Sequence, residues 1–263
     1  MNLIGTAWSD TVSSTFRAVT GNARPIVTLR RLRLVSGLVM LTYVTSHMFN
    51  HILGLVSVAW ADTMLRGVID IWQSRLGTIV LYGAFLIHIS LALRTIHRRR
   101  EWRLPWTEWL RLWAGFSLPL LLITHVVGTR VATTFYGFEP NYERVVTSII
   151  TGDRQGWQVA LLAPGWIHGC LGLWISLRHF PVFYRARMLL LAFMIAMPLL
   201  SALGFVRMVQ AVEASSDFVA RHPPPYATAL IEWREILLIC YVTLVIGAAI
   251  SGWLRRRITT VSQ

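Results

Sequence analysis

The stretch Thr45-Ser46-His47-Met48-Phe49-Asn50-His51 lies inside an otherwise almost wholly apolar run, Leu32 to Val58. Such a run is long enough for a membrane-spanning helix, which needs about 20 residues. Hydrocarbon gives an ionisable side chain no water, so a histidine at this depth indicates a functional site. The next three apolar runs each hold one deep histidine as well, namely His88, His125 and His168.

The composition favours a polytopic membrane protein over a soluble one. Of the 263 residues, 55% are hydrophobic, and the charged residues fall in a few short stretches. A helix is the only open-chain structure that satisfies its own backbone in lipid, so we expect an all-α fold. Domain 32–254 would hold the membrane helices, flanked by a cytoplasmic segment, 1–31, and a tail, 255–263. Six runs can span, with ends uncertain by a few residues: Leu32–Val58, Leu76–Ile96, Leu110–Val131, Gln158–Leu177, Met188–Val209 and Ile236–Leu254.

The charge distribution predicts the orientation of these spans. The net charge is +13, and every basic residue is an arginine. The arginines lie beside apolar runs, which favours a topological role over nucleic-acid binding. Most of them fall at the two ends of the chain and in the 2–3 and 4–5 connections, so we expect both termini in the cytoplasm. The runs 97–100 and 255–257 are interpreted mainly as stop signals at the inner face.

Helix geometry sorts the four deep histidines into two layers. At about 1.5 Å per residue, His47 and His125 lie roughly 22 Å from the cytoplasmic edge, whereas His88 and His168 lie roughly 12 to 14 Å from it. If helices one to four form an up-down bundle, one faces three and two faces four across its centre. Each layer then holds two histidines that face each other.

Two facing histidines can ligate a haem from both sides. Six-coordinate iron keeps no open position, so such haems carry electrons rather than bind oxygen. A proton pathway or a di-metal site would normally add carboxylates, and the first four runs contain none. Histidines that only pack or line a cavity remain an alternative. Two b-type haems fit the pattern best, with His47 and His125 on the outer haem and His88 and His168 on the inner one.

Several other residues are expected to lie beside these haems. His51 follows His47 by one helical turn on the same face, and we expect it next to a haem propionate or a quinone, although it could replace His47 as the ligand. Glycines would thin helix faces where a flat ring enters, or permit close helix packing: Gly37, Gly77, Gly128 and Gly172. Buried propionates need arginine or water, and the candidates are Arg31, Arg94 and Arg98 for the inner haem and Arg130 with His51 for the outer one. No catalytic motif was found, so no catalytic residue is predicted.

One histidine on each of four consecutive helices resembles the di-haem cytochrome b anchor of succinate dehydrogenases and fumarate reductases. The matching residues are His47, His88, His125 and His168, and the resemblance covers roughly Leu32 to Leu177. Arg30-Arg31-Leu32 followed by Ser36-Gly37 also looks like that family's entry segment. The sixth span departs from the family, and no flavoprotein or iron–sulfur subunit is visible in the sequence.

A closer resemblance covers nearly the whole chain. The runs RRLRLVSGLVMLTYVTSHMFNHILGL, LGTIVLYGAFLIHISLAL, LPLLLITHVVGTR and WIHGCLGLW are similar to the six-helix anchor of class III adenylate cyclases from rhizobia and their relatives. That resemblance implies a redox sensor in the bacterial inner membrane, which passes electrons from the quinone pool through the haems to a cytoplasmic ferredoxin-like and cyclase part. Neither output domain lies in these residues, so cyclase activity is not assigned to them.

Two other functions remain open at this point. The same haem chemistry would serve an anchor subunit of a succinate dehydrogenase-like or fumarate reductase-like respiratory complex. A haem-free receptor or scaffold would use the histidines only for packing or for a small ligand. The sequence also leaves the oligomeric state open, a homodimer included.

Overall fold

The computed structural model describes residues 24–215 and 224–261, and in these ranges it contains helices and turns but no β-strand. The all-α prediction is therefore confirmed. Six helical segments are long and apolar enough to cross a membrane, as the hydropathy pattern predicts. Their helices are α2 (Arg24–Ile52), α4 (Arg75–Arg98), α5 (Trp106–Val126), α8 (Gln155–Leu177), α10 (Arg187–Glu213) and α11 (Ala227–Val261).

The third span continues beyond α5 through a π-helical turn, η2 (Val127–Val131), into α6 (Ala132–Tyr136). The sequence predicted its end at Val131. Gly137 ends the helix in the left-handed conformation, with a φ of 69° that a residue without a Cβ adopts at little cost. The span is therefore longer than its apolar run, because the helix ends at the glycine and not where the hydropathy falls.

Two of the connections contain helices that the sequence did not reveal. The first span ends at η1 (Leu53–Leu55), because Ser57 caps a new helix, α3 (Val58–Trp72), by accepting a hydrogen bond from the Trp60 amide. Asn141 caps α7 (Tyr142–Thr151) in the same way. On the opposite side of the fold, the short α9 (Pro181–Arg185) joins α8 to α10.

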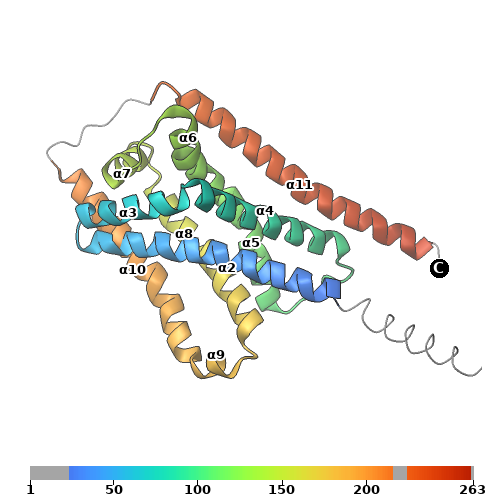
Figure 1. Cartoon of the computed structure of the whole chain (residues 1–263). Coiled ribbons are helices and arrows are strands. Elements are labelled where there is room, and N and C mark those ends of the chain that lie inside the picture. Colours follow the sequence, from blue (N-terminus) through green and yellow to red (C-terminus); the bar gives the residue numbers. More distant parts are fainter. Residues whose placement is uncertain (1–23, 216–223, 262–263) are drawn as a thin grey trace, which may run out of the picture.

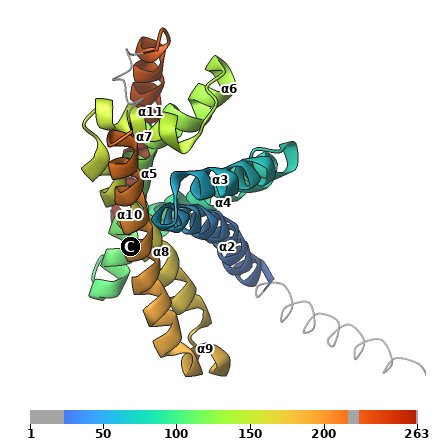
Figure 2. The same ribbon diagram turned by 90° about the vertical axis from the view of Figure 1, so that its left-hand side faces the viewer.

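The contacts between spans do not confirm a closed bundle of the first four helices. Helix α2 packs against α4, α8 and α10, and α5 packs against α8 and α11. Helix α11 also runs along α4, so the last span lies against both α4 and α5, as Figures 1 and 2 show. The second, first, fourth and third spans are therefore neighbours in that order, and α11 bridges the remaining side between α5 and α4.

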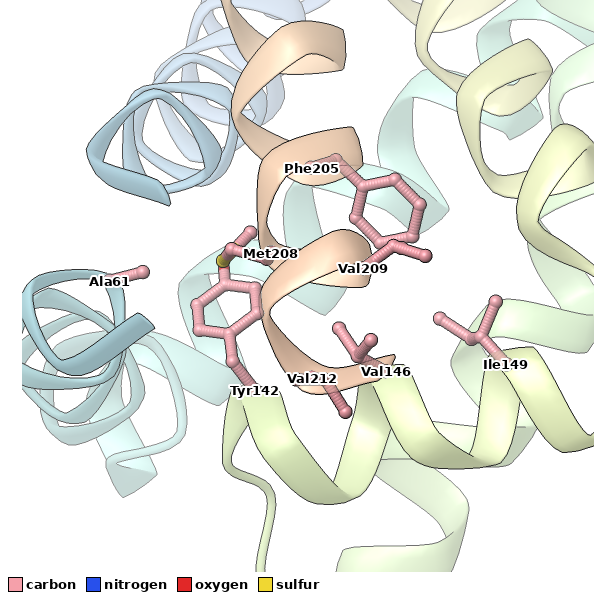
Figure 3. Packing of buried hydrophobic residues seen from close by; sticks show 8 residues of the cluster. All are labelled: Ala61, Tyr142, Val146, Ile149, Phe205, Met208, Val209 and Val212. Carbon is pink, nitrogen blue, oxygen red and sulfur yellow. The ribbon is translucent and has the colours of Figure 1, made fainter. Parts of the chain in front are cut away.

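Apolar packing concentrates at the end of the fold where α10 ends (Figure 1). There α3 and α7 cover α10 through one cluster of buried side chains (Figure 3): Ala61, Tyr142, Val146, Ile149, Phe205, Met208, Val209 and Val212. A smaller cluster of Met48, Trp166 and Met197 joins α2, α8 and α10. These two clusters hold the C-terminal half of α2, which carries His47 and His51, against α10.

Gly204 permits this contact between α10 and α2. A Cβ at this position would lie 2.9 Å from the carbonyl carbon of His51 and 3.2 Å from the Cα of Ile52. Backbone cannot move aside as a flexible side chain can, so any residue larger than glycine would push the two helices apart.

Gly204→Val should therefore destabilise the protein by about 1–3 kcal/mol, the usual cost of overpacking. The measurement is thermal unfolding of the purified protein in detergent, followed by circular dichroism. Gly247→Val on α11 is the matched control, because a Cβ there meets no atom within 4 Å. Equal unfolding midpoints for the two variants would contradict the close approach of α10 to α2.

Candidate functional site

The structure brings His47 on α2 and His125 on α5 together. Their ring centroids are 5.8 Å apart, and the ring planes are inclined at 69°. Nδ1 of His125 lies 3.1 Å from Oε1 of Gln158 on α8. Because an amide oxygen only accepts, Nδ1 carries the proton, and the lone pair of this imidazole lies on Nε2.

His88 on α4 and His168 on α8 form a second facing pair, with ring centroids 6.0 Å apart and planes inclined at 83°. Nδ1 of His168 donates to the backbone carbonyl of Arg111 at 2.9 Å, so its Nε2 also keeps the lone pair. Nδ1 of His88 shares a 3.2 Å hydrogen bond with the buried hydroxyl of Ser36. Both imidazoles are thus held through the nitrogen nearer the backbone, as is usual for metal-binding histidine.

Glycines admit these rings between the helices. A Cβ on Gly37 would come within 3.3 Å of His88, and one on Gly115 within 2.5 Å of His168. Gly128 and Gly172 follow His125 and His168 by three and four residues, on the same helix face, and a Cβ on either would meet no atom within 4 Å. Gly77 differs, because it packs against the backbone of α3 at Ile71 and Trp72 rather than beside a histidine.

His51 lies beside His47 but does not face His125. Nε2 of His51 and Nε2 of His47 are 3.3 Å apart. The other rings that His51 contacts are those of Tyr142 and Phe205, at 5.6 and 5.7 Å between centroids. His47 is therefore the α2 histidine that the fold pairs with α5, whereas His51 points toward α7 and α10.

A network of hydrogen-bonded polar residues lies beside His51. The sequence alone did not indicate this network. Nδ2 of Asn50 donates to the hydroxyl of Tyr142 at 2.9 Å, and the backbone amide of Tyr142 donates to Asp62 at 2.7 Å. Burial and the nearby Asp62 carboxylate raise the pKa of Tyr142, so its phenol stays protonated. The hydrogen bond between Asn50 and Tyr142 joins residues that are 92 positions apart in the sequence, and no local pattern predicts it.

The arginines nominated from the sequence are not those nearest the inner pair. The side chains of Arg31, Arg94 and Arg98 are exposed. Two others, Arg33 and Arg111, lie close enough to His88 to interact with it electrostatically. Arg111 lies inside the predicted third apolar run, and a charge within such a run is the signal that could have identified it.

Arg33 and Arg130 both make hydrogen bonds between spans. The guanidinium of Arg33 donates to Thr95 on α4 at 2.8 Å. Arg130, which was nominated for the outer haem, is half-buried and donates to Thr78, also on α4, at 3.1 Å. Each guanidinium is thus bonded to a threonine of α4, and the side chain of Arg33 is also exposed at the surface.

The spacing of both pairs fits bis-histidine ligation. With metal–nitrogen bonds of about 2 Å, two imidazoles on opposite sides of one metal have ring centroids roughly 6 Å apart. The separations of 5.8 and 6.0 Å agree with that value. Within residues 24–215 and 224–261, no group of three or more His, Cys, Asp or Glu side chains converges as a metal site.

No family model, no curated protein and no solved structure matches this chain.

Tyr142→Phe should destabilise the protein by about 1–3 kcal/mol, because the buried amide of Asn50 would lose its acceptor. The shift is measured as the unfolding midpoint in detergent. Tyr184→Phe is the control, since Tyr184 is exposed. If the midpoint of Tyr142→Phe does not differ from that of the control, the bond between Asn50 and Tyr142 does not contribute to stability.

Proposed function

We propose that this chain is a di-haem b-type cytochrome membrane domain that exchanges electrons with membrane quinone. The observation that carries the proposal is the pair of facing imidazole couples, His47 with His125 and His88 with His168. Each couple joins helices that are distant in sequence, and three of the four rings are anchored through Nδ1. When bound, haem iron would supply one-electron oxidation and reduction.

The residues around the couples have separate tasks in this function. Gln158, the Arg111 carbonyl and Ser36 fix the orientation of three rings and leave Nε2 of each of these three as the ligating atom. Nε2 of the fourth ring, His47, lies 3.3 Å from Nε2 of His51. Arg33 and Arg111 place positive charge beside the inner couple, where it would pair with a propionate and favour the reduced iron. Both couples lie on apolar spans, which in a membrane would keep water from them.

The role of the electrons rests on resemblance. The likeness to cyclase anchors supports a redox-sensing role in the bacterial inner membrane, with the arginine-rich ends facing a cytoplasmic output that is ferredoxin-like and cyclase-like. An anchor subunit of a succinate dehydrogenase-like or fumarate reductase-like complex is the second candidate, supported by the same histidines. Genomic context separates the two, because a neighbouring cyclase reading frame favours sensing, and flavoprotein and iron–sulfur subunits favour respiration.

Two b-type haems should copurify with each chain, and the reduced-minus-oxidised spectrum should be that of low-spin, six-coordinate haem. A pyridine haemochrome assay against protein concentration gives the ratio. One haem per chain, or a high-spin spectrum, would contradict two bis-histidine sites. A colourless, fully folded protein would instead favour the haem-free receptor or scaffold.

Substitution of the ligands should reveal the pairing. His47→Ala and His125→Ala should lose the same haem, and His88→Ala and His168→Ala should lose the other. Redox titration of each variant identifies which haem remains. His179→Ala serves as the control, because this exposed histidine lies in the turn before α9. If His51→Ala loses a haem that His47→Ala keeps, the ligand on α2 is His51.

Removal of a nearby positive charge should lower the midpoint potential of one haem, because that charge stabilises the reduced form. Arg33→Gln should therefore lower the potential of the inner haem while both haems stay bound. The sequence nominated Arg94, and Arg94→Gln tests that assignment directly. Because Arg33 interacts electrostatically with His88, a smaller shift is expected for Arg94 than for Arg33. A larger shift for Arg94→Gln than for Arg33→Gln would show that Arg94 acts more strongly on the inner haem than Arg33.

A further inference from the structure

The ends of α4 and α11 form a basic hollow at the arginine-rich side of the fold. Six residues line it, and its cavity volume is about 10 Å³, roughly the space of one water-sized group. None of the six carries a carboxylate, and five of them are basic: His97, Arg98, Arg100, Gly252, Arg255 and Arg256.

Specific contacts build this hollow. A Cβ on Gly252 would lie 2.6 Å from the carbonyl oxygen of His97, so only glycine lets the backbones approach this closely. Nδ1 of His97 and the hydroxyl of Ser251 share a 3.0 Å hydrogen bond. Arg256 donates to the carbonyl of Arg99 at 2.5 Å, which satisfies one acceptor at the end of α4. Arginines about 155 positions apart in the sequence therefore meet at one place.

The electrostatics of the hollow favour a multivalent anion. The orientation of the spans in the membrane is enough to explain arginines at their ends. It does not explain why the arginines at the ends of α4 and α11 line one cavity. The side chains of Arg98, Arg100 and Arg255 are exposed. A cavity this small admits one oxygen atom, and the rest of the anion would lie at the surface among the guanidinium groups, which suit phosphate geometry.

Aromatic side chains place the hollow at headgroup level. Trp253, on α11 next to the lining residue Gly252, is about half exposed, and Arg257 lies over its ring at 4.8 Å. Trp102, just past the end of α4, is also exposed. Exposed tryptophans beside apolar spans are typical of the membrane–water interface, where lipid phosphates lie.

We propose that the basic hollow between α4 and α11 binds a phosphate group, either that of an anionic phospholipid or that of a soluble phosphate compound. The site is separate from the histidine pairs, and its occupancy would fix the end of α11 against α4. The proposal does not depend on haem, because binding is read from the lipid or phosphate itself.

The test compares phosphatidylglycerol with phosphatidylcholine, each added to the purified full chain in detergent and followed by native mass spectrometry and by the unfolding midpoint. Phosphatidylglycerol should be retained and should raise the midpoint, whereas phosphatidylcholine should do neither. The double variant R100Q/R255Q should bind phosphatidylglycerol at least about tenfold more weakly, because two charges near the surface are lost. Inorganic phosphate that raises the midpoint as strongly as phosphatidylglycerol would identify a soluble source.

The control R178Q/R185Q removes two arginines at the ends of α8 and α9 that lie outside the hollow. It should bind phosphatidylglycerol as the unmodified chain does. If both double variants lose phosphatidylglycerol binding equally, the effect comes from general surface charge and the proposed site is wrong. If R100Q/R255Q does not fold, the single variant R100Q decides, because Arg100 is exposed. Undiminished retention of phosphatidylglycerol by folded R100Q overturns the proposal, as does equal binding of the two lipids by the unmodified chain.

Discussion

An imidazole within a membrane span must find a polar partner inside the protein, because hydrocarbon offers none. Five histidines of this chain lie under that constraint. Three of them meet it at Nδ1, whereas His47 and His51 contact each other through Nε2, and Nδ1 of His51 is buried without a partner among the described residues. Gln158, Ser36 and the Arg111 carbonyl supply partners at Nδ1, and Gly37 and Gly115 let the rings of the inner couple approach their neighbouring helices. The helices are therefore positioned by what the histidines require as much as by apolar contact between them.

The sequence was sufficient for the parts of this fold that depend on one helix at a time. Span number and approximate ends follow from apolar length, and rise per residue placed His47 level with His125 and His88 level with His168. The facing of those rings in the structure agrees with these depths, although haem ligation itself remains a proposal. Contacts between segments that are far apart in the sequence were not predicted. Asn50 lies in the histidine-containing stretch 45–51, but its partner Tyr142 belongs to a helix whose short amphipathic pattern has no long apolar run.

The position of α11 is the clearest example of a tertiary arrangement that hydropathy does not predict. Depth and chain order imply a four-helix bundle, but the order of spans in space depends on which faces pack closely. Gly252 admits the His97 backbone, and Tyr241 donates to the Phe116 carbonyl at 2.7 Å, so α11 lies against α4 and α5 together. One glycine and one hydroxyl in a long apolar helix carry no distinctive periodic signal. The same pattern would suit a span that faces lipid on all sides.

The two couples differ in their surroundings, and the difference gives the proposed electron path a direction. The inner couple has the guanidinium groups of Arg33 and Arg111 near it, whereas the outer couple has a third imidazole, His51, and the protonated phenol of Tyr142 beyond it. Fixed positive charge favours the reduced state of a nearby metal, and neutral groups do so less. Arg111 is ion-paired with Glu108 at 3.1 Å, so under the proposed function Arg33 is the charge that makes the inner site the better electron acceptor. Electrons that enter at the outer couple would then move toward the arginine-rich end, where a cytoplasmic partner would receive them.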